Sequence, residues 1–269
     1  MGLRINSNDT ALSIQRQTQQ TTGALLRGFE RLATGQRINR AADDAAGLAL
    51  VERFRAQVSQ FNQEAANLQT GVNAVETADG GLSAQGDAVQ RIRELAVQAA
   101  NGTLTDDQRA ALNQEAQQLL EQVGETAENT EFNGQQLLNG AATAIDLGTE
   151  GNLQIAVQES TVASLGLSGL DLTTQAGAQN ALGAIDTALG RISENRANLG
   201  AQANRFTSAI EVREEQALNA EEAASRIRDI DIARQTIEQT RNNVLLQGGL
   251  AALVQSNIVG QNASRLLGG

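Results

Sequence analysis

The sequence predicts a mainly α-helical protein, an elongated antiparallel coiled-coil or helical-bundle rod with a small β-hairpin region in the middle of the chain. Three observations carry this prediction. The 269 residues include no Pro, the residue that removes a backbone donor and interrupts helices. Both halves repeat apolar residues at alternating spacings of three and four, which is typical of a coiled-coil seam. Between them lies one short stretch in which the apolar period falls towards two.

The seam of the first half predicts a helix over about residues 44–101. Asp79-Gly80-Gly81 interrupts the apolar pattern, and Asn101-Gly102 is typical of a helix end. The clearest section of the seam has eight successive apolar positions: Val51, Phe54, Val58, Phe61, Ala65, Leu68, Val72 and Val75.

A shorter helix and a β-hairpin are predicted next. The helix spans about residues 105–129 and begins with a capping box between Thr105 and Gln108. Over about residues 140–174 the apolar period falls towards two around a Gly-containing turn, which predicts a β-hairpin. The Gly- and Ser-rich stretch 160–169 is expected to fold back on the helices as a loop.

The second half predicts a helix over about residues 176–227. Thirteen of fifteen successive seam positions from Ala178 onward are apolar, and the two exceptions are Arg196 and Arg213. Such a helix is about 75 Å long, whereas a compact domain of this chain length has a radius of gyration of about 18 Å. We therefore expect a rod, formed by residues 44–227.

The seams weaken towards both chain ends, in residues 1–43 and 228–269. Thr, Gln and Gly dilute the apolar positions there, so these terminal helices should be marginal alone and order only on assembly. We expect them to form a second domain, the core through which copies of the chain pack together. The seam residues predicted to mediate this self-assembly are Ile14, Leu25, Leu32, Ile230, Ile237, Val244, Val254 and Ile258.

The composition disfavours an enzyme. Without His, Cys or Lys the chain has no imidazole base, thiolate or Schiff-base amine, and we expect no cofactor and no metal site. A hydrolase built on two carboxylates is still formally possible, but five Phe are few for a substrate site. The acidic pairs Asp43-Asp44 and Glu221-Glu222, like Asp229 and Asp231, are more simply helix-end or solvated charges.

The charge and hydropathy of the chain argue against two further classes of partner. A net charge of −11 disfavours nucleic acid, whose binding depends on cationic contacts to phosphate. No apolar run approaches the roughly 20 residues of a membrane span, and the first residues lack the pattern of a signal peptide.

Two groups of residues are candidate surface sites. Arg91 and Leu95 lie four residues apart beside the seam, where packing on a neighbouring helix is the simpler interpretation and binding the alternative. Hydroxyl groups in the middle of the chain could carry glycans, and the candidates are Thr149, Ser160, Thr161 and Ser164.

Five segments of the chain resemble bacterial flagellin. They occur in the order of the family and together bracket nearly the whole sequence: Leu32–Leu48, Gln90–Asn101, Thr130–Gly134, Asn204–Ile210 and Ser225–Asp231. The resemblance is to a short form that lacks the outer variable domains.

The resemblance implies a structural subunit that polymerises into the flagellar filament for motility, with its terminal helices in the filament core. It also implies export as an unfolded chain by the flagellar type III system to the extracellular filament. The partners it implies are an export chaperone, the filament cap and the junction proteins. Host Toll-like receptor 5 is a further implied partner, contacted through Arg91, Leu95 and Glu115, which match the family pattern.

Two other functions remain open alternatives. A hook–filament junction protein resembles flagellin at both ends without forming long filaments, and the match around Arg91 favours flagellin over it. A type III secreted helical effector is a helical binding module, for which matched motifs at both ends are not expected.

Overall fold

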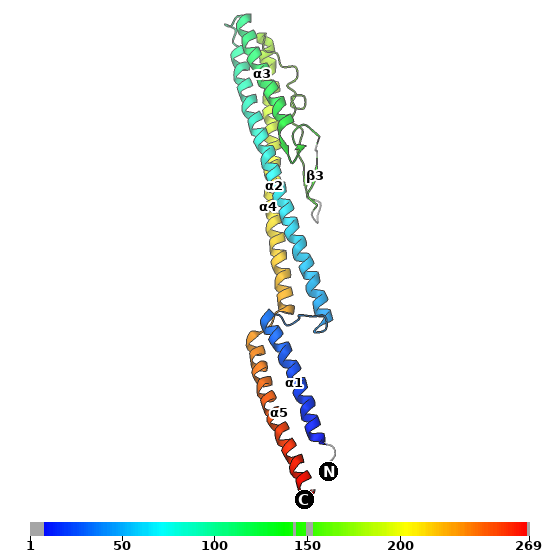
Figure 1. The fold of residues 1–269 in the computed structure, drawn as a ribbon. Helices are drawn as coiled ribbons and strands as arrows, with labels where there is room; N and C mark the ends of the chain where they lie inside the picture. Colours follow the sequence, from blue (N-terminus) through cyan, green and yellow to red (C-terminus); the bar gives the residue numbers. More distant parts are fainter. Residues whose placement is uncertain (1–7, 142–143, 149–152, 268–269) are drawn as a thin grey trace. The chain divides into compact units, whose positions relative to one another are not determined.

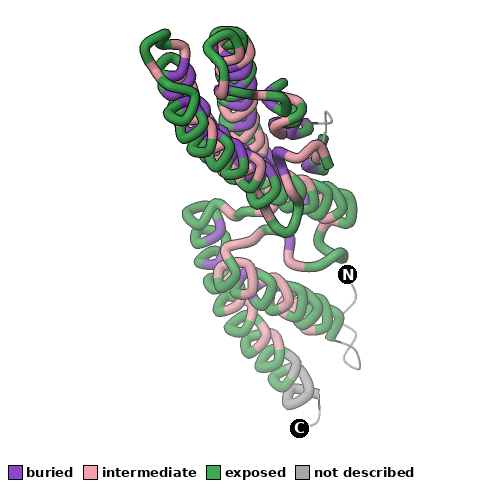
Figure 2. Tube along the Cα trace, turned by 90° about the horizontal axis from the view of Figure 1, so that it is seen from above, coloured by how far each residue is buried: buried purple, intermediate pink, exposed green. Residues whose placement is uncertain are grey.

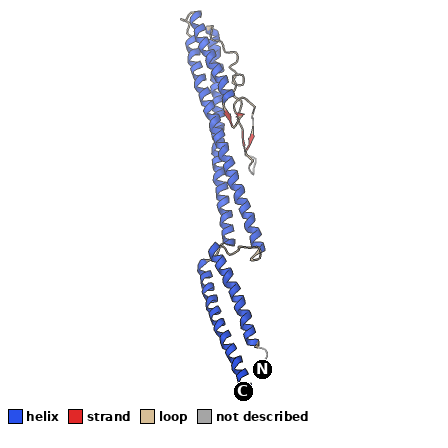
Figure 3. Ribbon diagram, viewed as in Figure 1, coloured by secondary structure: helices blue, strands red, loops and turns tan. Residues whose placement is uncertain are grey.

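The computed structural model describes residues 8–141, 144–148 and 153–267. These residues form five helices and two antiparallel two-stranded hairpins, which confirms the predicted fold class (Figures 1 and 3). In chain order the elements are α1 (Asp9–Thr34), α2 (Ala45–Ala99), α3 (Asp106–Asn129), β1 (Glu131–Phe132), β2 (Gln135–Gln136), β3 (Ile145–Asp146), β4 (Gln154–Ile155), α4 (Gln175–Arg228) and α5 (Ile232–Leu267).

The chain divides into two compact units. Residues 1–57 and 219–269 make one, here called the terminal unit, and residues 58–218 make the other, the central unit. The limits of the units fall within α2 and α4, whereas the sequence placed the domain limits at about residues 43 and 228. The assignment of these regions to a core and a rod domain stays a prediction.

The central unit is a bundle in which α4 and α3 each run antiparallel to α2. Its core includes the predicted seam, because every α2 seam position that lies in this unit is buried or half-buried. Leu68 and Val75 of α2 are enclosed together with Ile185, Ile192 and Phe206 of α4. Figure 2 shows that the buried residues are concentrated along these helices.

The turn between α2 and α3 confirms the predicted helix end and the predicted cap. Thr105 and Gln108 form the capping box, with bonds of 3.0 and 3.3 Å. The guanidinium group of the buried Arg109 donates to the carbonyl groups of Ala99 and Asn101, both at 3.1 Å. A cation thereby satisfies carbonyl groups at the C-terminal end of α2, where the helix dipole favours positive charge.

The interruption of the seam at Gly80-Gly81 does not break α2, which continues through both glycines. A Cβ atom at Gly81 would lie 2.5 Å from Thr130 Oγ1 and 2.9 Å from Leu138 Cδ1. A Cβ atom at Gly71 would likewise lie 2.7 Å from Leu147 Cδ1. Glycine at these two positions therefore lets the segment after α3 pack directly on the helix backbone.

The middle of the chain contains the predicted hairpin and one that was not predicted. In the predicted hairpin Ile145 pairs with Ile155. The other, β1–β2, turns through Asn133 and Gly134, whose positive φ angles of 51° and 75° are those of a two-residue turn that favours Asn-Gly. The loop 160–169 folds back as expected, with its leucines buried in the core.

A buried polar contact fixes this loop on the bundle. Gln85 of α2 is fully enclosed, and its Nε2 donates to the carbonyl oxygens of Val123 at 3.0 Å and Ser160 at 2.9 Å. Ser160 Oγ donates in return to Gln85 Oε1 at 2.7 Å. A buried amide with both of its ends bonded stabilises the packing, because an unpaired one would lose its hydration without compensation.

The terminal unit contains α1 packed antiparallel against α5. Asn8 caps α1 by accepting from the Ala11 N–H at 3.0 Å, and Gly35 ends the helix in the left-handed conformation, with φ 70°. Residues 36–44 are a loop rather than a continuation of the predicted terminal helix, because Gly35 turns the chain out of the helix and Asp44 starts α2 by accepting from the Gly47 N–H.

Candidate self-assembly surface

The seam of α1 faces α5 within the same chain. Leu25 is buried, and Ile14 and Leu32 are half-buried. Gly28 lies against Gln239 so closely that a Cβ atom there would collide with the amide side chain. The structure thus places the α1 part of the predicted self-assembly seam in a contact inside the chain, so its use between copies stays a prediction.

The face that α5 turns towards α1 is polar along its first half. Gln235 and Gln239 are buried there, and Gln239 Nε2 donates to the Leu25 carbonyl oxygen at 3.4 Å. At the far end Ser256 and Asn8 exchange two bonds of 3.1 and 3.2 Å. The α5 residues of this face form a row with the 3–4 spacing, offset from the predicted seam. The row consists of Gln235, Gln239, Asn242, Leu246, Gly249, Leu253 and Ser256.

The predicted seam of α5 lies on its outer face, exposed in the single chain. Ile237 is 70% exposed and Val244 63% exposed, and Val254 and Ile258 are exposed as well, whereas Ile230 is half-buried. We call Ile237, Val244, Val254 and Ile258 the outer face of α5. Helices normally bury aliphatic residues of this kind, but on α5 they remain in water. Their regular spacing is that of a packing surface without its partner.

The outer side of α1 also carries large apolar residues, which the sequence reading missed. Leu12, Leu26 and Phe29 are more than half exposed. Leu26 directly follows the seam position Leu25, and Phe29 comes three residues later, so a second apolar side on this helix was the available signal. We call these three residues the outer face of α1.

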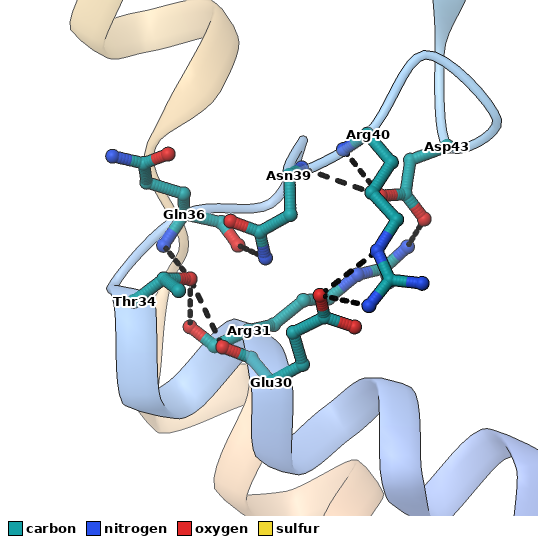
Figure 4. A network of polar contacts seen from close by, with 7 residues as sticks. All are labelled: Glu30, Arg31, Thr34, Gln36, Asn39, Arg40 and Asp43. Atoms are coloured by element: carbon teal, nitrogen blue, oxygen red, sulfur yellow. Dashed lines mark hydrogen bonds and ion pairs between the residues drawn. The ribbon is translucent and has the colours of Figure 1, made fainter.

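The loop between α1 and α2 is fastened to the last turns of α1 (Figure 4). Arg40 binds Glu30 at 2.7 and 3.1 Å, and Arg31 lies 3.5 Å from Asp43. Burial acts to raise the pKa of Asp43, but the N–H groups of Arg40 and Asn39 together with the Arg31 guanidinium lower it on balance. Asp43 therefore stays ionised and able to accept the N–H groups of Asn39 and Arg40 down to pH values below its ordinary pKa.

The other acidic residues considered as catalytic candidates have structural roles or face solvent. Asp231 starts α5 by accepting from the Arg234 N–H at 3.1 Å, and Asp229 accepts from Ser225 Oγ at 2.6 Å. Glu221 and Glu222 are exposed. Among the described residues no group of three or more acidic side chains could hold a metal ion, and no helix in them is apolar enough over 18 residues to cross a membrane.

The structure brings together two of the three receptor-binding candidates. Arg91 Nη2 lies 3.0 Å from Glu115 Oε1 across α2 and α3, Arg91 Nη1 lies 2.8 Å from Glu94, and all three side chains are exposed. Hydrogen bonds to both carboxylates raise the pKa of Arg91, and the bond to Glu94 has the larger effect. Leu95 is only 2% exposed and belongs to the core, so the packing interpretation applies to this residue in the folded chain.

The candidate glycan sites are less open than the sequence suggested. Ser160 has no exposed surface, and its hydroxyl group is bonded to Gln85, which corrects the expectation of a glycan there in the folded chain. Thr161 donates to Glu159 at 2.7 Å, and Ser164 is half-buried beside it. Thr149 lies outside the described residues.

Comparison with known proteins gives concordant similarities. Residues 5–143 match the family described as the bacterial flagellin N-terminal helical region, and residues 182–267 match the bacterial flagellin C-terminal helical region. A flagellin of Halalkalibacterium halodurans is 38% identical over 269 residues, covering 98% of this chain and 99% of the relative. Flagellin FlaB1 of Treponema pallidum is 36% identical over 283 residues, with 98% and 99% covered.

Solved structures extend the similarity to the fold. A putative flagellar hook-associated protein of Vibrio parahaemolyticus has a TM-score of 0.59 at 14% identity, covering 70% of this chain and 100% of that one. At that identity the likeness concerns the fold alone. The crystal structure of Bacillus cereus flagellin is 29% identical, with a TM-score of 0.49, and covers 55% of this chain and 88% of that one.

Proposed function

Because the chain belongs to the bacterial flagellin family and is a structural subunit of the flagellar filament, we propose that the outer faces of α5 and α1 supply contacts between subunits. The observation that carries the proposal is the row of exposed apolar residues along α5, led by Ile237 and Val244. Burying each such side chain against a neighbour would contribute about 1.5–3 kcal/mol.

Two different faces favour an open polymer over a closed dimer. A surface that pairs with itself gives a twofold dimer, whereas a surface that pairs with a different surface of the next copy continues as a helical filament unless the rotation closes a ring. The outer face of α5 is a row of aliphatic residues, and the outer face of α1 is centred on Leu26 and Phe29. We propose that the first packs on the second of the next subunit.

Export of the chain in an unfolded form by the flagellar type III system, to a filament outside the cell, is part of the same proposal. A chain without Cys and Pro has neither disulfides nor slow X-Pro isomers to delay threading and refolding. The export chaperone, the filament cap and the junction proteins are its proposed partners besides copies of itself.

The pairing of the two faces is tested by adding variants to filament seeds of the unaltered protein. Ile237→Ser/Val244→Ser removes the centre of the α5 face, and Leu26→Ser/Phe29→Ser removes the centre of the α1 face. A growing tip presents one face and the incoming subunit the other. One variant should therefore fail to bind the tip, while the other should add once and then block further growth by unaltered protein.

Electron microscopy of filament length and labelled tips distinguishes the outcomes. If both variants elongate the seeds like the unaltered protein, the two faces are not the contacts. If both variants only fail to bind, with neither blocking the tip, the pairing of unlike faces is wrong. Short stubs from the unaltered protein would favour the junction-protein alternative.

Binding of Toll-like receptor 5 is a second proposed function. It is supported by the exposed pair of Arg91 and Glu115, which holds two of the family-implied residues on one surface of the central unit. We expect the monomer to activate a receptor reporter and Arg91→Ala to reduce the response several-fold.

A matched control is available for this substitution. Arg93 lies two residues away and is paired with Asp186 at 2.7 Å, with similar exposure. Arg93→Ala should leave the reporter response near that of the unaltered protein. An Arg91→Ala response equal to that of the control would rule out this binding surface.

A further inference from the structure

The apolar seam between α2 and α4 does not by itself determine which residues face one another. Its pattern repeats every seven residues, so sliding α4 by one heptad, about 10 Å along α2, again sets apolar positions against apolar positions. In coiled coils a polar group inside the seam often selects one register. The seam of α4 contains two such positions, Arg196 and Arg213.

Each of these arginines faces a carboxylate of α2. Arg213 Nε lies 2.8 Å from Glu64 Oε2, and Arg196 Nε lies 2.7 Å from Asp79 Oδ1. The two pairs differ in burial, because the side chains of Arg213 and Glu64 are 14% and 6% exposed, against 43% and 41% for Arg196 and Asp79. Exposed ion pairs contribute little, so the buried pair has the larger influence on the register.

The groups around the buried pair fit its charges in this register. Gln60 Nε2 donates to Glu64 Oε1 at 2.9 Å, and Arg213 Nη1 donates to Gln216 Oε1 at 2.8 Å. The guanidinium also lies over the ring of Phe61, 6.0 Å from its centre. The carboxylate and the guanidinium thus keep hydrogen-bond partners on their own helices while they bind each other across the seam.

A slip of one heptad would separate these charges. Glu64 would then face Phe206 or Ala220, the residues seven positions from Arg213 on either side. Set against an apolar seam residue in place of Arg213, the buried carboxylate loses the ion partner that offsets its lost hydration, which disfavours the slipped states.

We propose that the buried Glu64–Arg213 pair sets the register of α2 against α4 in the central unit. The pair acts by excluding slipped registers, because well-packed apolar residues in its place can stabilise a helix pair equally well. A single register gives every copy the same arrangement of the central unit, which a regular polymer requires.

The register can be measured as a distance between two spin labels. The chain contains no cysteine, so Ala66→Cys on α2 and Ser193→Cys on α4, both at exposed positions of the central unit, label it uniquely. These positions lie several turns apart along the helices, so a slip in either direction changes the distance between the labels. In this background the unaltered pair should give one distance by double electron–electron resonance. Glu64→Leu/Arg213→Leu should give a second population, displaced by about 10 Å along the helices, at unchanged helix content.

Two further variants make the outcome decisive. Glu64→Gln/Arg213→Gln removes the charges with side chains of similar length, and it should also give two distances. Arg93→Leu/Asp186→Leu removes an exposed pair across the same helices and should give one. One distance in both buried-pair variants, or two distances in the exposed-pair control, would overturn the proposal.

Discussion

At the scale of single residues, the glycines of α2 decide where the middle of the chain can pack. Gly81 stands against Thr130 and Leu138, whereas nothing lies within 4 Å of a Cβ atom at Gly80. The two glycines are neighbours inside one helix, so replacing either by alanine brings the same gain in helix propensity. The two replacements differ only in the neighbours that the new side chain meets.

Alanine at these two positions should therefore have opposite effects. Gly81→Ala should lower the free energy of unfolding by about 1–3 kcal/mol, because Thr130 and Leu138 must move. Gly80→Ala should raise it by about 0.5–1 kcal/mol, since alanine favours the helix and meets no neighbour. Denaturant unfolding followed by circular dichroism measures both, and equal effects would show that the close packing at Gly81 is unimportant.

Local chemistry explains which residues could be placed from the sequence. The capping box at Thr105 depends on side chains three residues apart, so its pattern is visible without any tertiary structure. The burial of Leu95 likewise agrees with the packing that its place beside the seam indicated. The burial of Ser160 depends on Gln85, which is 75 residues away, so local spacing gave no sign of it and this residue was expected to be too exposed.

At the scale of the elements, α5 shows what the apolar pattern can and cannot predict. The seam of Ile237 and Val244 predicted a helix correctly, yet α5 turns another row, with Gln235 and Gln239, towards α1. Hydrophobicity does not mark a polar contact row, so the partner of each face could not be assigned. The β1–β2 hairpin was missed because its strands contain only one apolar residue, Phe132, and so show no apolar period.

The polar contact between α1 and α5 should make this helix pair marginal in the free subunit. Buried amides add less stability than apolar packing, and the outer faces remain uncovered. We expect the free subunit to have less helix than the filament, by up to the 26 residues of α1 and the 36 of α5. Far-UV circular dichroism of both states measures the difference, and equal helix content would refute the expectation.

At the scale of the whole molecule, the two units differ in charge. Residues 58–218 contain 21 of the 31 acidic residues but only seven of the 20 arginines, so the negative charge belongs to the central unit. The terminal unit has arginines in slight excess. Contacts between copies through the terminal unit, as proposed above, would therefore bring together surfaces of nearly balanced charge.

The central claim is that the outer faces of α5 and α1, and not exposed apolar surface in general, drive assembly. Val244 on α5 and Val212 on α4 allow a matched test, since they are 63% and 53% exposed. Both can be replaced by serine, and the critical concentration for elongation of filament seeds can be measured by sedimentation. A lost valine contact of about 1.5 kcal/mol corresponds to about a tenfold change.

We expect Val244→Ser to raise the critical concentration about tenfold and Val212→Ser to leave it within a factor of two of the unaltered protein. An unchanged critical concentration for Val244→Ser, or an equal rise for Val212→Ser, would contradict the account.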